Sequence, residues 1–112
     1  MMIFSTFPDK PDPIHMGVSR RVLPGLNLDT TLYCQWKGFP DTVTWSKDNE
    51  ALRGDSYDVK QLIRNTDNGT VTSELVIKDV RTGNFGNYTC VGANQYGSNR
   101  ITESFQSKFL EF

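Results

Sequence analysis

The chain contains two cysteines, and the chemistry open to such a pair is a single disulfide bond. Trp45 follows Cys34 by eleven positions, and Tyr88 precedes Cys90 by two positions. This spacing is typical of a bridge between two stacked β-sheets, with the indole beside the sulfurs and the tyrosine hydroxyl bonded to the turn before its own strand. A bridge would indicate an oxidising compartment, whereas the alternative is two buried thiols in a reduced cytosolic domain.

A second group with chemical potential is the tripeptide Arg53-Gly54-Asp55, which holds a cation and a carboxylate close together in a turn-rich segment. An exposed carboxylate of this kind can complete a metal site on an integrin-type receptor. The simpler interpretation is that Gly54 and Asp55 only form a turn between two strands. A tripeptide is a weak signal, so the simpler interpretation is favoured.

Two segments match the acceptor pattern for N-linked glycans, Asn68-Gly69-Thr70 and Asn87-Tyr88-Thr89. Asn68 is expected at a loop tip. Asn87 is expected to point out of a strand because Tyr88 points in, and a glycan there would cover part of the outer sheet face. The pattern arises by chance about once in a chain with this much Asn and Thr, so modification is an expectation at both positions.

No residue set in the sequence is expected to act in catalysis or to hold a metal ion. His15 is the only histidine, and we expect it to be solvated. The cysteines are too far apart in sequence for a zinc knuckle, and Asp48, Glu50 and Asp79 are expected to be turn or surface carboxylates without partners. We therefore predict that the protein is not an enzyme and uses no cofactor.

The composition is that of a small globular domain. The 112 residues suffice for one domain, and the 37% hydrophobic and 12% aromatic fractions exceed those of disordered chains. The net charge is −1 and no dense run of Lys or Arg occurs, which argues against binding to nucleic acid or a membrane surface. No apolar run is long enough to span a bilayer, so we expect no direct membrane insertion.

The apolar pattern predicts seven or eight short strands and no helix. Two reversals, Asp48-Asn49 and Asn68-Gly69, are of types that tolerate positive φ. An antiparallel sandwich accommodates such a pattern. The predicted strands cover residues 14–22, 28–36, 43–47, 57–64, 71–78, 86–94 and 101–112.

Two of these strands place residues of very different size on the inward face. Trp36 follows Cys34 by two positions, and Gly92 follows Cys90 by two. If the cysteines face each other, Gly92 leaves room for the Trp36 ring. Other side chains expected to point inward are Val18, Val22, Tyr57, Val59, Leu75 and Ile77, with Gln61 or Ile63 continuing the face of Val59.

Residues 32–48, which contain Cys34 and Trp45, resemble the B-to-C region of an immunoglobulin domain. Residues 75–80 and 84–97 resemble its E strand and F–G region, and the positions of Cys90, Asn94 and Gly97 are similar to those of the I-set subclass. The resemblance implies an all-β fold, an immunoglobulin-like antiparallel β-sandwich of two sheets with Greek-key connections.

The resemblance extends over about residues 14–109, which are expected to form a single I-set domain. Residues 1–13 are then a leader, an interdomain linker or vector-derived residues, and residues 110–112 begin a linker to a following domain. No signal peptide is visible in the first seven residues. We expect that the signal was removed or that the domain comes from a longer chain.

This sequence departs from the subclass at two pairs of positions. Many members have Asp at the position of Asn84 and Arg at the position of Ser56, and these residues form an ion pair. We expect neutral hydrogen bonding to replace this ion pair. Gly92 stands where Ala is frequent and Trp36 where Val or Ala is usual, which supports the size compensation above.

The subclass is common in multidomain cell-adhesion receptors of the nephrin-like, neural adhesion and IgLON types. The resemblance therefore implies an extracellular module that recognises another protein or acts as a rigid spacer. Its partner could be another immunoglobulin-superfamily receptor, in homophilic or heterophilic contact, besides adjacent domains of its own chain. The alternative is an intracellular muscle-type domain that acts as an elastic scaffold unit.

The expected binding surface combines loop aromatics with an outer sheet face. Phe39 and Tyr96 are expected on two loops at one end of the sandwich, where exposed aromatics often anchor interfaces. Packing within the loops, or against a neighbouring domain, is the alternative role of these aromatics. Phe105 and Phe109 are further aromatic candidates. The outer-face residues expected to take part are Thr44, Ser46 and Val91.

Overall fold

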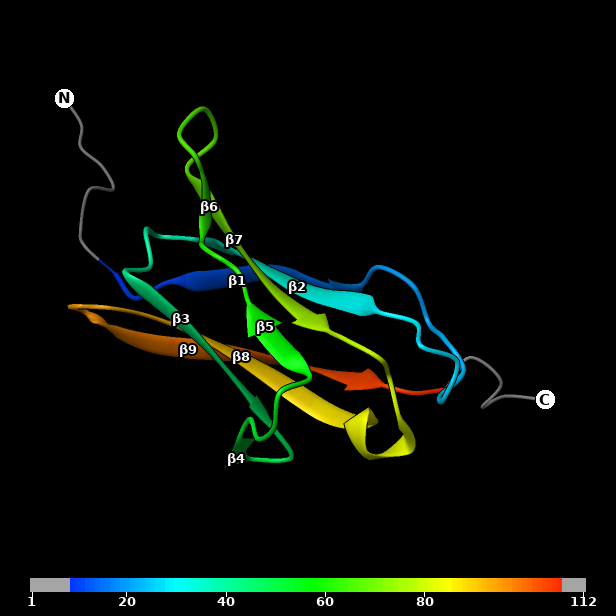
Figure 1. Cartoon of the computed structure of the whole chain (residues 1–112). Helices are drawn as coiled ribbons and strands as arrows, with labels where there is room; N and C mark the ends of the chain where they lie inside the picture. Colours follow the sequence, from blue (N-terminus) through cyan, green and yellow to red (C-terminus); the bar gives the residue numbers. More distant parts are fainter. Residues whose placement is uncertain (1–8, 108–112) are drawn as a thin grey trace, which may run out of the picture.

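The computed structural model describes residues 9–107, which form two antiparallel β-sheets packed face to face (Figure 1). The first sheet has the order β1 (Asp12–Val18), β2 (Thr30–Lys37), β7 (Thr70–Ile77) and β5 (Tyr57–Val59), and β6 (Ile63–Asn65) also pairs with β7. The second sheet has the order β4 (Glu50–Ala51), β3 (Thr42–Lys47), β8 (Gly86–Asn94) and β9 (Gly97–Phe105). One 3₁₀ turn, η1 (Thr82–Asn84), lies between β7 and β8.

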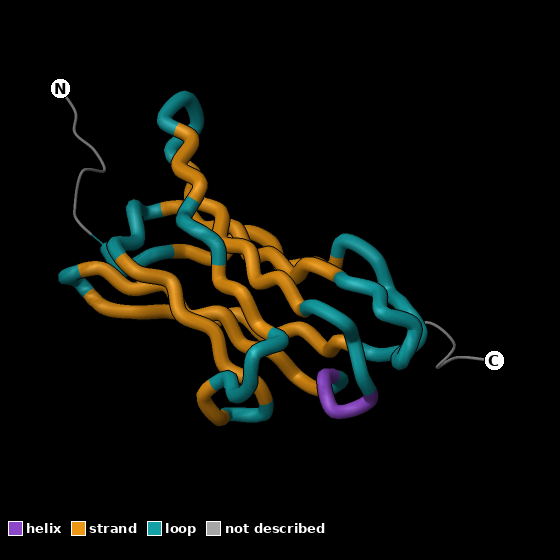
Figure 2. Tube along the Cα trace, viewed as in Figure 1, coloured by secondary structure: helices purple, strands orange, loops and turns teal. Residues whose placement is uncertain are grey.

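The connections confirm the predicted all-β sandwich. The chain changes sheets between β2 and β3, between β4 and β5, and between β7 and β8, as Greek-key connections do. Loops gather at the two ends of the sandwich, and β6 with the start of β7 forms a projecting hairpin (Figure 2). No helix in residues 9–107 is long and apolar enough to cross a membrane.

Alternation along β2 and β7 builds the centre of the core. Leu32, Cys34 and Trp36 are fully buried, whereas the residues between them are half-buried. Leu32 pairs with Leu75 across the two strands, so both inward faces are aligned in one register. This period-two burial is the pattern that the sequence predicts for these strands.

Cys34 and Cys90 form the predicted disulfide, which joins β2 in one sheet to β8 in the other, with a Cα–Cα distance of 6.6 Å. The indole nitrogen of Trp36 lies 3.3 Å from each of the two sulfurs. Trp45 is buried and pairs with Cys90 in register, but its indole nitrogen donates to the Ser73 hydroxyl at 2.8 Å. The polar edge of Trp36, not that of Trp45, therefore lies against the bridge.

Gly92 lies directly against the Trp36 ring. A Cβ atom at Gly92 would be 2.8–3.0 Å from three carbon atoms of the indole, closer than side chains tolerate. The ring is rigid and fully buried, so it has no free space into which it can move. Each of the two unusual residues thus requires the other.

The fourth predicted strand is divided in the structure. Val59 pairs with Leu75, but Ile63 pairs with Thr72, so the segment between β5 and β6 contains one extra residue relative to β7. One extra residue reverses which side chains face the core. The prediction that Gln61 or Ile63 continues the inward face is therefore wrong, and Ile63 is 51% exposed. Val59, on the edge strand, is also 48% exposed.

The first and last strands differ from the predicted boundaries. β1 begins at Asp12 and ends at Val18, and it includes Pro13 because it is an edge strand with a bulge between Pro13 and His15. β8 has the predicted bounds. β9 begins at Gly97, inside the predicted loop, and the end of the predicted last strand lies outside the described residues.

Candidate protein-binding surface

The β4–β3–β8–β9 sheet presents a hydroxyl-rich outer face. Trp45, Tyr88 and Cys90 point into the core, so their strand neighbours point outward. We call this surface the outer face, and Arg100 is its only charged member. Its residues are Thr42, Thr44, Ser46, Asn87, Thr89, Val91, Ala93, Ser98, Arg100, Thr102 and Ser104.

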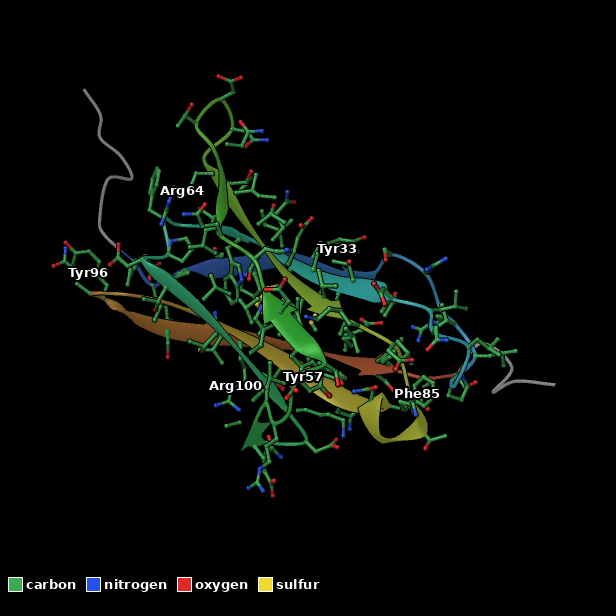
Figure 3. The ribbon with its side chains drawn as sticks, viewed as in Figure 1. Tyr33, Tyr57, Arg64, Phe85, Tyr96 and Arg100 are labelled. Carbon is green, nitrogen blue, oxygen red and sulfur yellow. A yellow bond between two sulfur atoms is a disulfide. The ribbon has the colours of Figure 1, made fainter. Side chains whose placement is uncertain are left out.

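The predicted surface residues lie together on the outer face. Thr44 pairs with Val91, and Val91 pairs with Arg100, so these three form a row across β3, β8 and β9. Ser46 pairs with Thr89 in the next outward row. Arg100 points away from the sandwich (Figure 3). The sequence therefore identified the central strands of this surface.

The contribution of β9 to the outer face was not predicted from the sequence. Thr89 and Thr102 face each other across β8 and β9, and their hydroxyl oxygens are 2.9 Å apart. Thr89 is only 6% exposed, because its neighbours cover it. The signal that could have identified Thr102 and Arg100 is that both are adjacent to the apolar Ile101, since successive residues of a strand point to opposite faces.

Two aromatic residues lie at one end of this sheet, on the β2–β3 and β8–β9 loops. Phe39 is 72% exposed and has a φ of 53°. Tyr96, which is 52% exposed, lies at the tip of the β8–β9 hairpin (Figure 3). The Asn94 side-chain amide donates to Gly38 O at 3.0 Å and to Asp9 O at 2.9 Å. This side chain therefore ties the two loops to each other.

The other two candidate aromatics are not part of this surface in the structure. Phe105 is fully buried and packs near Phe85, with ring centroids 5.1 Å apart, so the expectation that it takes part in recognition is wrong. Phe105 lies two residues after Glu103 on β9 and points to the same inward face, which explains its burial. Phe109 lies outside the described residues.

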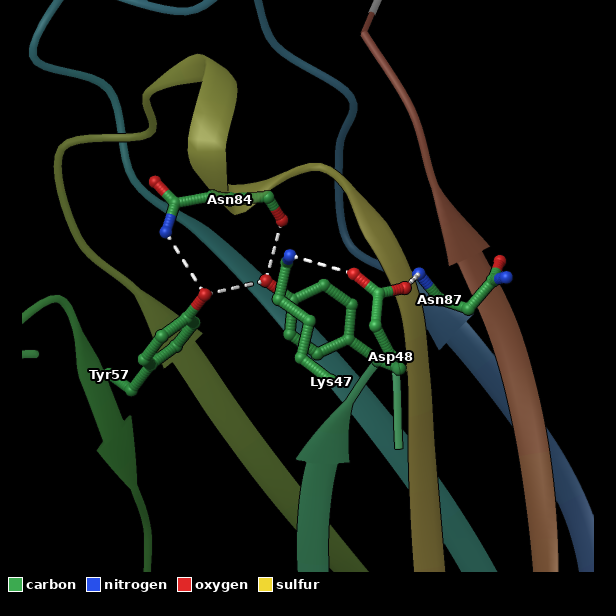
Figure 4. Close-up of polar contacts among 6 residues, drawn as sticks. Lys47, Asp48, Tyr57, Asn84 and Asn87 are labelled. Atoms are coloured by element: carbon green, nitrogen blue, oxygen red, sulfur yellow. Dashed lines mark hydrogen bonds and ion pairs between the residues drawn. The ribbon is translucent and has the colours of Figure 1, made fainter. Parts of the chain in front are cut away.

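A neutral hydrogen-bond network closes the opposite end of the sandwich (Figure 4). The Tyr88 hydroxyl donates to Asn84 O at 2.5 Å and lies 2.8 Å from the Tyr57 hydroxyl, to which Asn84 Nδ2 donates at 3.1 Å. Neutral hydrogen bonding thus replaces the expected ion pair, but Tyr57, not Ser56, supplies it. Ser56 instead accepts a backbone hydrogen bond from Lys78.

Burial and the hydrogen bond to Tyr57 hold the pKa of Tyr88 far above its usual value. Above about pH 10 the unfolded chain loses the Tyr88 proton while the folded chain keeps it. The free energy of unfolding should therefore fall as pH rises above this value, and the stabilisation is fully present below it. Urea unfolding measured from pH 7 to pH 11 checks this prediction.

Tyr88→Phe is expected to reduce this alkaline loss. It should also lower stability at neutral pH by about 1–2 kcal/mol, because Asn84 O and the Tyr57 hydroxyl each lose a partner. Tyr96→Phe, at an exposed tyrosine, is the matched control and should keep the alkaline loss. An unchanged pH slope in Tyr88→Phe would show that another group causes it.

The β3–β4 turn is anchored to β8 by a carboxylate beside Asn87. Asp48 Oδ1 accepts a hydrogen bond from Asn87 N at 3.0 Å, and Asp48 Oδ2 accepts one from Lys47 Nζ at 2.9 Å (Figure 4). These two hydrogen bonds, with that from Asn87 the larger cause, lower the pKa of Asp48. The expectation that Asp48 has no partner is therefore wrong, as it is for Glu50 and Asp79, which lie 3.8 Å from Arg53 and 2.8 Å from Arg81.

The Arg53-Gly54-Asp55 segment forms an exposed turn between β4 and β5. The Arg53 side chain is 84% exposed, and Gly54 has a φ of 91°. Asp55 lines a hollow that Lys78 and Arg81 also line. Arg53 and Asp55 thus have different neighbours. This arrangement is compatible both with a plain turn between strands and with a recognition loop.

The two potential glycan acceptors have different surroundings. Asn68 is exposed at the tip of the β6–β7 hairpin, where its Oδ1 accepts hydrogen bonds from Thr70 N at 3.1 Å and from Thr70 Oγ1 at 2.6 Å. Asn87 is exposed on β8, and its backbone is held by Asp48, whereas its side chain makes no hydrogen bond within residues 9–107.

No group of three potential metal-ligating side chains occurs within residues 9–107. His15 is exposed on β1, with its ring centroid 5.6 Å from that of Tyr33 and Nε2 3.4 Å from the Tyr33 hydroxyl. This pair lies on the first sheet, away from the outer face of the second.

Comparison with known proteins identifies related sequences. The chain matches the family profile of the immunoglobulin I-set domain over residues 18–106. It is 33% identical over 73 residues to neural cell adhesion molecule 1 of Rattus norvegicus, which covers 64% of this chain and 8% of that protein. It is 35% identical over 78 residues to the same protein of Gallus gallus, which covers 69% of this chain and 7% of that protein. The chain thus spans less than a tenth of the length of these relatives.

Two solved structures have the same fold. The N-terminal eight Ig domains of Down Syndrome Cell Adhesion Molecule (DSCAM) match with a TM-score of 0.71 and 24% identity, over 86% of this chain and 12% of that chain. Dpr2 Ig1-Ig2 in complex with DIP-Theta Ig1-Ig3 matches with a TM-score of 0.64 and 21% identity, over 85% of this chain and 31% of that chain.

Proposed function

Because the chain belongs to the immunoglobulin I-set family, we propose that it is an extracellular module of a multidomain adhesion receptor that binds another protein through its outer face. This family is non-enzymatic, and the chain resembles domains of cell-adhesion molecules. The disulfide supports an oxidising compartment, and so favours the extracellular hypothesis over that of an intracellular muscle-type scaffold.

The observation that carries the binding role is the chemistry of the outer face. Val91 lies at its centre, between Thr44 and Arg100, and most of the other surrounding side chains carry small hydroxyls. Such a face can be desolvated at low energetic cost, since it holds one charge and its hydroxyls can bond to a partner or to trapped water. Protein interfaces typically combine an apolar centre with a polar rim of this kind.

The aromatic end of the sheet supports the same role. Phe39 and Tyr96 are exposed, and the Asn94 hydrogen bonds hold their two loops together. Loops whose backbone is already held in position bind with a smaller loss of entropy, and aromatic side chains are enriched in interface hot spots. We propose that these two residues extend the contact beyond the edge of the outer face.

The partner proposed is a second immunoglobulin-type domain, either another copy of this chain or a different receptor. One of the similar structures is itself a complex between proteins described by their Ig domains, which supports this class of partner. Two flat sheet faces can meet over a large area without a protruding element on either side.

The test is a pair of equivalent substitutions on opposite sheets. Val91→Asp places a carboxylate at the centre of the outer face, and Val76→Asp places one at a half-buried outward position on β7 of the other sheet. Self-association is measured by sedimentation equilibrium, and heterophilic binding against a panel of immunoglobulin-type ectodomains. Val91→Asp should weaken binding at least about tenfold, since a carboxylate at the centre of the face, even beside Arg100, must lose its hydration when a partner covers it.

Val76→Asp is the control and should change binding less than about twofold. Melting curves of both variants verify that each is folded. Equal losses in the two variants would contradict the assignment of the outer face. Binding that is absent in the unmodified chain, both to itself and to the panel, would favour the spacer role.

A further inference from the structure

We propose that Asn87 carries an N-linked glycan whose first sugar rests in a polar hollow between the β3–β4 turn and β9. This inference rests on the extracellular location proposed above. The acceptor pattern identifies Asn87 as a possible site, and the structure adds the hollow in which the attached sugar would lie.

The geometry of Asn87 leaves its side chain free to be modified. Its backbone N and O are both bonded to Asp48, so the residue is fixed in position. Its side chain points away from Asp48 (Figure 4), and no hydrogen bond holds its amide among the described residues. The Thr89 hydroxyl that completes the acceptor pattern lies on the same face of β8.

The chemistry of attachment requires a lipid-linked oligosaccharide as donor and the transferase of the secretory pathway. A bond forms between Asn87 Nδ2 and C1 of the first sugar. The bond between C1 and the pyrophosphate oxygen of the donor breaks, and the lipid pyrophosphate leaves with its electron pair. The amide nitrogen loses one proton, which the transferase accepts.

A hollow of about 240 Å³ lies directly beside Asn87. Its polar lining consists of Asp48, Asn49, Thr89, Arg100 and Thr102, besides Asn87 itself. Arg100 is exposed and takes part in none of the ion pairs found within residues 9–107, so its guanidinium can donate to sugar oxygens. Asn49, at the tip of the β3–β4 turn, offers a side-chain amide from the opposite wall.

The surroundings of Asn68 provide a contrast within the same chain. Its side-chain oxygen closes a turn with Thr70, at the tip of a projecting hairpin (Figure 2). A sugar on Asn68 would therefore extend into solvent, and only the sugar on Asn87 should contact the fold.

The seat is compatible with the proposed binding role. Asn87 and Val91 are four residues apart on β8, a separation of about 13 Å along a strand. A glycan that lies toward the β3–β4 turn would cover one end of the outer face. Thr44, Val91 and the aromatic loops would stay accessible, whereas Arg100, at the end of their row, would contact the sugar.

The first experiment maps the modification. The full chain is secreted from eukaryotic cells, and peptides are analysed before and after enzymatic release of glycans, which converts a modified Asn to Asp. Asn87 is expected to be occupied. Thr89→Val should abolish this occupancy, and Thr89→Ser, which keeps the acceptor pattern, should retain it.

The second experiment tests whether the first sugar contacts the hollow, by measuring the melting temperature. It uses an Asn68→Gln background, so that only one glycan is present. Trimming to a single sugar should leave the melting temperature unchanged. Complete removal, made by Asn87→Gln because enzymatic release would leave an Asp at this position, should lower it by roughly 3–5 °C, the shift expected from about one net hydrogen bond in a domain of this size. In Arg100→Ala, complete removal should lower it by less than half as much.

Three results would overturn the inference: no sugar on Asn87, no thermal effect of complete removal, or a thermal effect of the same size with and without the Arg100→Ala substitution. None of these readouts involves a partner. Secreted chains with an intact disulfide but no sugar on Asn87 would reject this inference alone. A chain whose Asn87 glycan stabilises the fold but that binds no partner would support this inference and contradict the proposed binding role.

Discussion

Removal of the disulfide by Cys34→Ala and Cys90→Ala together is expected to lower the free energy of unfolding by about 4 kcal/mol. The bridge closes a loop with a sequence separation of 56 residues, and loop-closure entropy of the unfolded chain gives this magnitude. A domain of this size has about 5–15 kcal/mol in total, so the variant should be marginally stable. Urea unfolding followed by tryptophan fluorescence measures the difference.

Chemical reduction of the unchanged chain is the control for this prediction. It breaks the covalent link but keeps both sulfurs as weak acceptors for the Trp36 indole N–H, which lies 3.3 Å from each. The alanine variant also loses these acceptors and should be less stable than the reduced chain by about 1 kcal/mol. If both forms unfold at the same urea concentration as the oxidised protein, the bridge is not a main source of stability.

Gly92→Ala is expected to destabilise the domain by about 1–3 kcal/mol, although it adds a single methyl group. The added Cβ would lie 2.8 Å from one indole carbon of Trp36 and 2.9 Å from another. Both groups are in the core, so relief requires movement of a packed ring or of a central strand. Gly83→Ala is the matched control, because a Cβ there meets no atom within 4 Å.

A double-mutant cycle tests whether Trp36 and Gly92 compensate each other. Trp36→Val alone leaves a cavity and should reduce stability by about 3–5 kcal/mol. The double variant restores the pair of sizes that is usual in the subclass, and its loss should be smaller than the sum of the single losses by at least about 1 kcal/mol. Strictly additive losses would show that the two residues do not share one packing site.

The bounds of β8 and its inward residues could be predicted because three signals agree there. Tyr88, Cys90 and Gly92 alternate, Gly86 precedes them, and Asn94 ends the run. Local alternation determines which side chains are buried wherever a strand is regular. The same rule places Thr44 and Val91 on the outer face from residue order alone.

The rule failed where the register shifts. The extra residue between β5 and β6 has no signature in the sequence, and it leaves Ile63, one of the two residues expected to continue the inward face, exposed. The polar partners were also beyond prediction. The bond between Asp48 and Asn87 joins residues 39 positions apart, and that between Asn84 and Tyr57 joins residues 27 apart. Such contacts depend on how two loops meet at one end of the sandwich.

The sequence alone determined the fold class, the disulfide and the size pairing of Trp36 with Gly92, because each depends on residue type and on spacing along single strands. Only the tertiary structure decided which indole lies against the sulfurs, that Tyr57 replaces Ser56 in the closing network, and that Arg100 and Thr102 join Asn87 around one hollow. The physical reason is that these features arise between strands and loops distant in sequence. Their relative placement is set by the packing of two sheets, which no local pattern records.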